Sequence, residues 1–353
     1  MRALRAAGYE PVAVAPADPA GEAILKEWQV RFLPVRIARS GVNPVTDARL
    51  FAYYRQLLKR LRPAAYLGFT IKPNVYGSLA AASLKIPVLP TVCGLGTAFL
   101  RGGMLQMVVS RLYGAAFGRR PIVFFQNADD AALFMERGIV RSGQARLVPG
   151  FGIDLDRFEP SPLPQGPPVF LLIARLLRDK GVGEFVQAAR SLRPEFKDTR
   201  FQLLGAIDDG NPTAVGRVEI DQWVCEGIVE YLGETSDVRP FISASTAVVL
   251  PSYREGLPQA LIEAGAIGRP AVATDVPGCR DVIVAGETGL LCRPRDAASL
   301  ADGIRQMMEL SHEERVAMGE AARRRVQSVF SEGLALGYYV DALEELISRP
   351  LEP

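Results

Sequence analysis

The stretch that decides the fold of this chain is VVLPSYREGLPQALIEA, residues 248–264. Its β-branched opening ends at Pro251, because proline cannot continue a central strand. A loop follows, and Pro258 stands where a helix can begin, since the first helical position needs no N–H donor. The stretch therefore predicts a strand, a loop and a helix, which is the repeating unit of an α/β protein.

Two glutamates flank this turn, Glu255 in the loop and Glu263 in the helix, with seven residues between them. At about 1.5 Å of rise per residue, Glu263 lies only about one and a half turns inside the helix. The backbone N–H groups near Gly256 and Leu257 open a helix N-terminus, which attracts phosphate. Each glutamate alone is also explained as a solvated residue or as a complement to the helix dipole. Together they fit a ligand that carries both hydroxyls and phosphates.

Short apolar runs alternate with helical patterns on both sides of Pro160–Pro168, a stretch typical of a linker. We predict one domain over residues 1–160, a second over 161–333 and a final helix over 334–353. The first domain opens with a helix and then a strand, whereas a doubly wound domain normally opens with a strand and a glycine-rich loop. We therefore expect its first strand to be missing, and favour a start codon assigned too late over a fold that tolerates the loss.

The composition of the 353 residues, 48% hydrophobic and 23% charged, is that of a soluble globular protein. No run reaches the ~18 uncharged apolar residues of a spanning helix, and Met1 is not followed by the apolar core of a secretory signal. The four cysteines form no C-x-x-C pair. We expect them to be reduced thiols of a cytosolic protein, not metal ligands.

The net charge of +2 hides a strongly basic front third. Residues 1–128 carry 17 Lys and Arg against 5 Asp and Glu, and the remainder is acidic. This favours an anionic partner, either a membrane surface or a phosphorylated ligand, over nucleic acid, for which no motif is present. The amphipathic segment 99–120 predicts a packed surface helix or, alternatively, an interfacial helix on an anionic membrane.

Four blocks follow one another at a specific spacing: PSYREGLP (251–258), EA (263–264), GRPAVATD (268–275) and GETGLL (286–291). This pattern resembles the retaining glycosyltransferases of family 4, whose signature is two glutamates separated by seven residues. The resemblance covers nearly the whole chain. It implies the GT-B fold, in which two Rossmann-like doubly wound domains face each other across a cleft, and a nucleotide-sugar donor without a cofactor.

The resemblance also implies roles for the residues of the second domain. Glu255 would contact the donor sugar and stabilise developing positive charge, and Glu263 would hold the ribose hydroxyls. Gly256 and Leu257 would offer backbone N–H groups to phosphate or sugar.

Two cations follow the first strand of the second domain, Arg175 and Lys180. By the family pattern they would neutralise the departing nucleoside diphosphate, Arg as a fork and Lys as a point charge, so that no metal ion is required. The pair Asp208–Asp209 lies beside Gly210 and is typical of a turn, not of a metal site.

Three further blocks, TIKPNVYG (70–77), GLG (94–96) and FFQNADD (124–130), resemble the bacterial PglA-like undecaprenyl-diphosphate-sugar N-acetylhexosaminyltransferases. The loops leave the carboxyl ends of strands, where open α/β sheets bind ligands. The acceptor-side candidates are therefore Lys72, Asn74, Cys93 and Asn127. Cys93 departs from the pattern, because many family members carry a histidine there. The chain's only histidine, His312, stands near a helix start in the tail and reads as a solvated residue.

We therefore predict a metal-independent retaining hexosyltransferase that moves a hexose or N-acetylhexosamine from a UDP-sugar to an undecaprenyl-diphosphate-linked glycan. The product would enter bacterial surface polysaccharide or glycoprotein glycan synthesis, and the protein would be cytoplasmic, peripheral to the inner face of the cytoplasmic membrane. Two alternatives remain: a nucleotide-sugar epimerase of the same fold, and a non-catalytic protein that binds sugar nucleotides.

Overall fold

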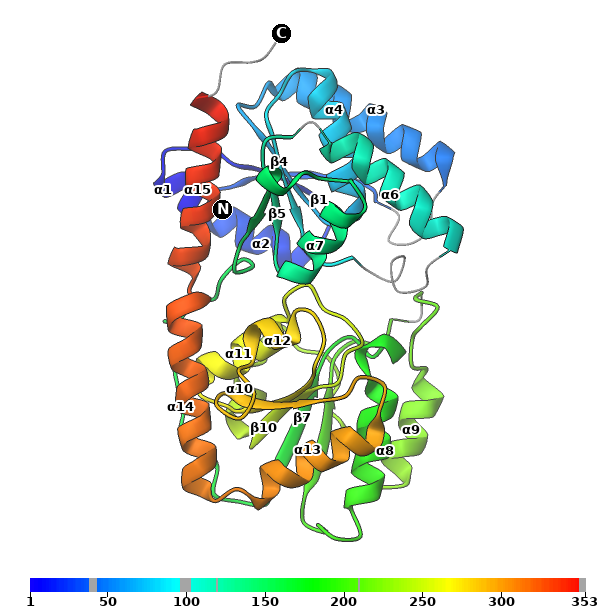
Figure 1. The fold of residues 1–353 in the computed structure, drawn as a ribbon, viewed down its shortest axis with the longest axis vertical. Coiled ribbons are helices and arrows are strands. Elements are labelled where there is room, and N and C mark those ends of the chain that lie inside the picture. Colours follow the sequence, from blue (N-terminus) through cyan, green and yellow to red (C-terminus); the bar gives the residue numbers. More distant parts are fainter. Residues whose placement is uncertain (38–42, 96–102, 119, 209, 349–353) are drawn as a thin grey trace. The chain divides into compact units, whose positions relative to one another are not determined.

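The computed structural model describes residues 1–37, 43–95, 103–118, 120–208 and 210–348. The chain divides into two compact units (Figure 1). Unit 1 comprises Met1–Val148 and Gly333–Pro353, and unit 2 comprises Pro149–Glu332. Gly96 of the GLG block, residues 99–102 and 119 of the predicted segment 99–120, and Asp209 lie outside the described residues.

The strands of unit 1 are short, parallel and largely apolar. They are β1 (Val12–Ala15), β2 (Arg31–Pro34), β3 (Tyr66–Phe69), β4 (Val88–Val92), β5 (Val123–Phe125) and β6 (Ala145–Leu147). β4 is buried at every position, as expected of a strand that is covered on both faces. The strands form a pair, β1-β2, and a four-stranded sheet in the order β3-β4-β5-β6.

No hydrogen bonds join the two sheets of unit 1 among the strands that the structure describes. The sheets nevertheless share a core, because Val14 of β1 and Tyr66 of β3 pack against the same apolar cluster under α3 (Pro44–Leu61). A helix, α1 (Arg2–Ala6), precedes β1, as the sequence predicts.

The remaining helices of the first part of unit 1 are α2 (Pro19–Glu27), α4 (Ser78–Ser83), α6 (Gly103–Phe117) and α7 (Ala128–Glu136), with a π-helical turn at Pro73–Gly77 before α4. α3 begins after Asn43, whose Oδ1 accepts hydrogen bonds from the N–H groups of Val45 and Thr46. On α6, Met104 and Met107 are exposed. Across the parts of the chain in view, no helix is both long and apolar enough to cross a bilayer.

The last helix, α15 (Glu332–Ser348), packs on unit 1 although it is far from it in sequence. Tyr339 meets Phe124 of β5 edge to face, with ring centroids 5.1 Å apart. Arg146 of β6 donates two hydrogen bonds, 2.6 and 2.9 Å long, to the two carboxylate oxygens of Glu345. The apolar face of α15 thus belongs to the same core cluster as β4 and β5.

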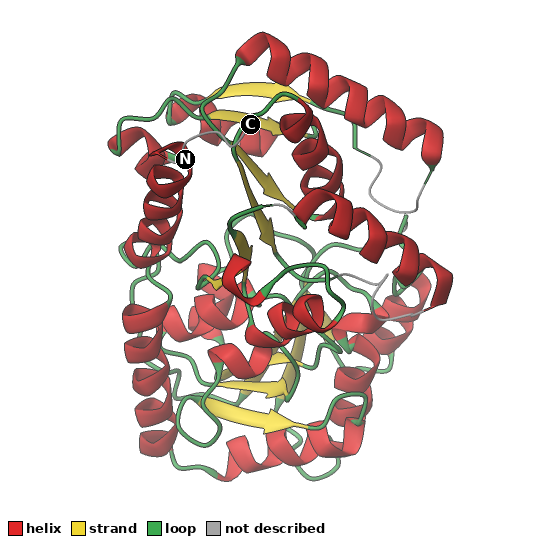
Figure 2. Ribbon diagram, turned by 45° about the horizontal axis from the view of Figure 1, so that its top comes forward, coloured by secondary structure: helices red, strands yellow, loops and turns green. Residues whose placement is uncertain are grey.

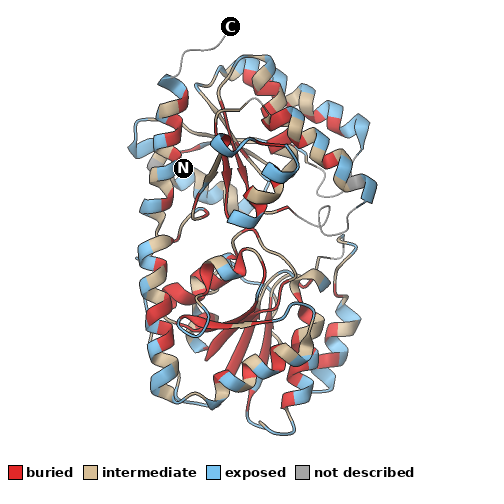
Figure 3. Cartoon of the chain, in the orientation of Figure 1, coloured by how far each residue is buried: buried red, intermediate tan, exposed pale blue. Residues whose placement is uncertain are grey.

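Unit 2 is built on a six-stranded parallel sheet in the order β12-β11-β10-β7-β8-β9. Its strands are β7 (Val169–Ile173), β8 (Arg200–Leu204), β9 (Glu230–Tyr231), β10 (Ala247–Leu250), β11 (Ala271–Thr274) and β12 (Gly289–Cys292). The central strands are almost wholly buried (Figure 3). The strand order reverses between β7 and β10, and open α/β sheets bind their ligands at the carboxyl ends of strands at such a switch point.

Helices cover both faces of this sheet (Figure 2). They are α8 (Val182–Leu192), α9 (Arg217–Cys225), α10 (Arg239–Ala244), α11 (Gln259–Ile267), α12 (Cys279–Val282), α13 (Ala297–Glu309) and α14 (His312–Val329). α8, α9 and α13 contribute to one core cluster, and α10, α11 and α12 to the other.

The division between the units falls at Val148, earlier than the boundary predicted at residue 160. Residues 149–160 belong to unit 2 because their backbone is bonded to it: the N–H of Ile153 donates to Phe330 O at 2.9 Å. The proline-rich stretch is not a free linker either. The guanidinium of Arg269, only 1% exposed, donates to the carbonyl oxygens of Ser161 and Pro162 at 2.8 Å. Composition could not reveal these contacts, since they depend on residues distant in sequence.

Candidate active site

The predicted donor-side residues lie at the switch point of the unit 2 sheet. Arg175 and Lys180 follow β7, and Glu255, Gly256 and Leu257 follow β10, the neighbouring strand. Loops that leave adjacent parallel strands at the same edge meet there. The two loops are bonded directly, because Tyr253 N–H donates to Asp179 O at 2.9 Å.

Close packing of these loops depends on Gly181. Its φ of +72° lies in the left-handed region, which a side chain disfavours. A Cβ at this position would also collide with the carbonyl oxygen of Pro251, at the end of β10. Gly181 thus allows the β7 loop to approach the β10 loop, and α8 begins directly after it.

The central contact of the site is an ion pair between the two loops. Lys180 Nζ lies 2.5 Å from Glu255 Oε1, and the two side chains are 22% and 13% exposed. The hydroxyl of Ser252, which is fully buried, donates to the same oxygen at 2.6 Å. The structure therefore brings together a cation and a carboxylate that are 75 residues apart in sequence.

Glu263 has a different environment on α11. Its carboxylate accepts no hydrogen bond from any residue that the structure describes. Burial raises the pKa of this carboxyl to about 7, and the nearby charge of Arg157 opposes the rise only in part. A desolvated carboxylate without donors is poised to accept hydrogen bonds from hydroxyl groups of a ligand.

Arg175 stands apart from this pair. Its side chain is 59% exposed and forms an ion pair with Asp208 at 3.1 Å. Such an exposed pair contributes only about 0–1 kcal/mol to stability, so its guanidinium can exchange Asp208 for another anion at little cost. Gly256 is buried, and Leu257 packs at the edge of the core before α11 begins at Gln259, one residue after the predicted Pro258.

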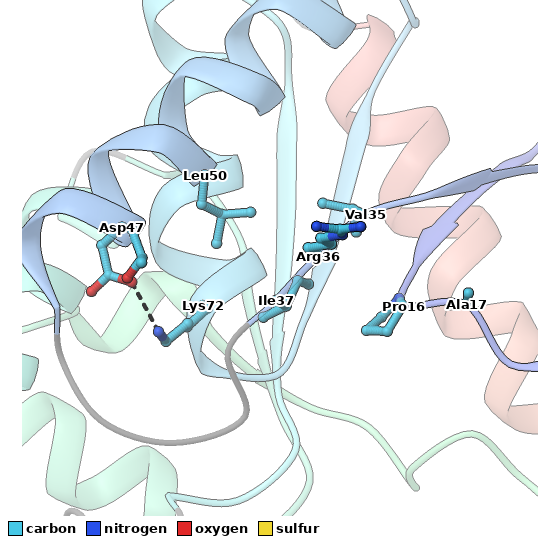
Figure 4. A pocket seen from close by; sticks show the side chains of 9 residues that line it. Pro16, Ala17, Val35, Arg36, Ile37, Asp47, Leu50 and Lys72 are labelled. Carbon is cyan, nitrogen blue, oxygen red and sulfur yellow. Dashed lines mark hydrogen bonds and ion pairs between the residues drawn. The ribbon is translucent and has the colours of Figure 1, made fainter.

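On unit 1, Lys72 is half of a second ion pair. Its Nζ lies 2.9 Å from Asp47 Oδ1, and Tyr76 OH donates to Asp47 Oδ2 at 3.0 Å. The pair lines a cavity of about 490 Å³ at the carboxyl ends of β1 and β2, together with Arg36 and Leu50 (Figure 4).

The other three acceptor-side candidates have structural partners. The Asn74 side chain, wholly buried, donates to Thr91 O at 2.7 Å. Asn127 caps α7, where its Oδ1 accepts from Asp130 N–H at 2.8 Å. Burial raises the pKa of the Cys93 thiol to about 11, which keeps it protonated at neutral pH.

Sequence reasoning missed the residues that hold the site together. Ser252 lies inside the quoted PSYREG block, but its spacing to Glu255 gives no sign that the two side chains meet. Tyr253 OH donates to Glu184 Oε1 at 2.5 Å, and the Arg295 guanidinium lies 4.7 Å from the centre of the tyrosine ring. These groups follow β7, β10 and β12, and they meet only because the three strands lie in one sheet.

Comparison with known proteins identifies the two units separately. Residues 1–150 match the family model described as glycosyl transferase 4-like domain, and residues 155–325 match glycosyl transferases group 1. The chain is 28% identical to the N,N'-diacetylbacillosaminyl-diphospho-undecaprenol alpha-1,3-N-acetylgalactosaminyltransferase of Campylobacter jejuni over 327 residues, covering 88% of this chain and 84% of the relative.

Two further similarities agree with these matches. The putative colanic acid biosynthesis glycosyltransferase WcaL of Escherichia coli is 30% identical over 195 residues, 52% of this chain and 47% of the relative. The crystal structure of HepE from Anabaena in complex with UDP and glucose superposes with a TM-score of 0.79 at 18% identity, covering 95% of this chain and 92% of that chain. Residues 1–150 are therefore a glycosyl transferase 4-like domain and residues 155–325 a glycosyl transferases group 1 domain, and this chain is a GT-B glycosyltransferase.

Proposed function

We propose that this chain is a retaining glycosyltransferase that takes a hexose or N-acetylhexosamine from a UDP-sugar. The Lys180–Glu255 pair at the switch point of unit 2 carries the proposal. In it, the ammonium group neutralises the diphosphate leaving group, and the carboxylate stabilises the positive charge that develops on the sugar. The complex of HepE with UDP supports a uridine nucleotide, since its fold is the same.

The remaining donor contacts follow from the same loops. Glu263 accepts the ribose hydroxyls, which supply the hydrogen-bond donors that its carboxylate lacks in unit 2. Gly256 and Leu257, just before α11, offer N–H groups to phosphate or sugar. Arg175 exchanges Asp208 for the diphosphate. With two cations on the leaving group, the reaction proceeds without a metal ion.

We further propose a lipid-linked acceptor, an undecaprenyl-diphosphate glycan, bound by unit 1. The name of the Campylobacter relative supports this acceptor class. Lys72 and Arg36 in the unit 1 cavity supply positive charge for it, while Asn74, Cys93 and Asn127 shape the neighbouring loops. The name of WcaL supports a place in surface polysaccharide synthesis. The protein then works in the cytoplasm, at the inner membrane face.

The proposal is tested with radiolabelled UDP-N-acetylgalactosamine, UDP-N-acetylglucosamine and UDP-glucose, each with and without an undecaprenyl-diphosphate-linked N-acetylhexosamine. We expect label in the organic phase only when a donor and the lipid are both present, an α linkage in the product by NMR, and unchanged turnover in EDTA. A donor that is epimerised when incubated alone would favour the epimerase. Donor binding without transfer to any acceptor would favour a non-catalytic protein.

A further inference from the structure

Glu255 is fixed by groups outside the predicted site. The Ser252 hydroxyl donates to Glu255 Oε1 at 2.6 Å, on the oxygen that also meets Lys180. Ser252 is itself anchored, since its carbonyl oxygen accepts a hydrogen bond from the hydroxyl of Thr274, the last residue of β11. Ser252 thus links the Glu255 carboxylate, through its own hydroxyl, to Thr274 at the end of β11, through its carbonyl group.

The backbone of Glu255 is fixed by the turn that follows β11. Its N–H donates to Pro277 O at 3.2 Å. The next residue, Gly278, has a φ of +84°, and a Cβ there would lie 2.8 Å from both Glu255 Cβ and Gly256 O. Asp281 Oδ2 accepts from the N–H of Gly278 at 2.9 Å and holds the turn in place. The space that a side chain at position 278 would fill is therefore occupied by Glu255 and the carbonyl group of Gly256.

We infer that Ser252 and Gly278 are positioning residues for Glu255. Ser252 fixes the carboxylate, and the missing Cβ of Gly278 fixes the backbone that carries it. The inference rests on the proposed role of Glu255. The inference adds that catalysis depends on how the Glu255 loop is held against β11 and the turn after it, although β11 carries none of the predicted site residues.

Each residue also has a simpler explanation, and the chain supplies a matched control for each. Gly286 has a φ of +79°, close to that of Gly278, but a Cβ there would meet nothing within 4 Å. Ser245 is fully buried like Ser252, but its hydroxyl donates to Ile242 O, at the end of α10. If Gly278 served only the turn, Gly278→Ala and Gly286→Ala would behave alike.

The first test compares the two glycine variants in the transfer assay and in UDP calorimetry. We expect Gly278→Ala to lower kcat at least ~10-fold by displacing Glu255, and to weaken UDP binding by a smaller factor because the same Cβ also meets Gly256 O. Gly286→Ala should keep kcat within about twofold, although thermal unfolding shows a similar cost of the positive φ. Equal effects of the two variants on kcat would overturn the role of Gly278.

The second test needs no change of backbone. Ser252→Ala should lower kcat ~10-fold or more, whereas Ser245→Ala should not. In a Glu255→Gln background, Ser252→Ala should cost nothing further, because a residue that acts through Glu255 is non-additive with it. The same loss in both backgrounds would overturn the inference. If Glu255→Gln alone kept full turnover, the proposed function of Glu255 would fail first. If Glu255→Gln were impaired and neither Ser252→Ala nor Gly278→Ala was, only the positioning role would fail.

Discussion

Two lysine–carboxylate pairs, one in each unit, show how similar contacts serve different purposes. In unit 1, Asp47 is 6% exposed and accepts hydrogen bonds from Lys72, Tyr76 OH and the N–H of Asn43. In unit 2, the Lys180–Glu255 pair is more exposed, and the same carboxylate oxygen accepts a hydrogen bond from Ser252. The Asp47 carboxylate is thus bonded on both oxygens within unit 1, whereas the more exposed Lys180–Glu255 pair follows two neighbouring strands at the switch point of its sheet, where open α/β sheets bind ligands. We therefore expect removal of Lys72 to lower stability first and removal of Lys180 to lower activity first.

The two units also differ in net charge. Unit 1 carries 21 Lys and Arg against 12 Asp and Glu, and unit 2 carries 20 against 27. The unit that we assign to a nucleotide is therefore acidic overall, and its cations are local, at the β7 loop. The excess of positive charge in unit 1 fits a broad anionic surface better than one phosphate.

Removal of the Lys180 side chain should have the largest effect. Lys180→Ala should lower kcat/KM ~10- to 100-fold, equivalent to about 1–3 kcal/mol for a charged hydrogen bond, and Arg175→Ala should cost less because its side chain is exposed. Lys197→Ala, which removes an exposed lysine of unit 2, is the control. Near-normal turnover in both Lys180→Ala and Arg175→Ala would remove the diphosphate assignment.

The unit 1 pair should instead respond in stability. Lys72→Met leaves Asp47 buried without its cation, so the free energy of unfolding should fall by about 2–4 kcal/mol in urea denaturation, with UDP affinity unchanged. Arg36→Ala should not alter stability, because Arg36 is exposed and bonded to no described residue, but it should raise the KM for the acceptor. Unaltered stability of Lys72→Met would show that the pair is not structural.

Glu263 should make stability depend on pH. Its pKa is raised to about 7, so the folded protein binds a proton more tightly than the unfolded chain, and stability falls as the pH rises from about 4.5 to above 7. Glu263→Gln should therefore be more stable than the wild type at pH 8, by about 1–3 kcal/mol, and equally stable at pH 4.5. Denaturation at the two pH values measures this, and equal stability at pH 8 would contradict the desolvated carboxylate.

The basic surface of unit 1 should produce the smallest effect, a weak attraction to membranes. Binding to vesicles should require anionic lipid and should weaken as salt shortens the Debye length to about 3 Å at 1 M. Replacing the exposed Met104 and Met107 of α6 by serine should reduce binding at low salt a few-fold, to about the level of charge attraction alone. Equal binding to neutral vesicles would assign the basic surface to something else.

The fold class could be predicted because its signals are local. Apolar runs such as 169–173 and 247–250, each followed by a loop and a helix, are strands in the structure. The positions of Arg175, Lys180 and Glu255 in the loops after β7 and β10 were likewise predictable, while their roles toward a donor stay predictions. The division between the units falls at Val148 and not at residue 160, since Arg269 and Phe330 bond residues 149–162 to unit 2 from far along the chain.

The unit 1 candidates were harder to judge. Asn74 and Asn127 lie in loops after strands, which is where ligand-binding residues also lie, and sequence alone does not show that their amides are bonded to Thr91 O and Asp130 N–H. Ser252 and Gly278 were missed because they were not recognised as neighbours of Glu255. Their importance comes from contacts with Glu255 across two loops, which no spacing within one block encodes.

The central claim is that Glu255 serves the reacting sugar and Glu263 the nucleotide. Calorimetry with UDP on Glu255→Gln and Glu263→Ala, beside their turnover, tests it most directly. Glu255→Gln should lower kcat strongly and leave UDP affinity nearly unchanged, because it removes charge needed only in the transition state. Glu263→Ala should weaken UDP binding by about 1–3 kcal/mol. Loss of UDP binding in Glu255→Gln with retention in Glu263→Ala would exchange the roles, and full activity of both variants would contradict the account.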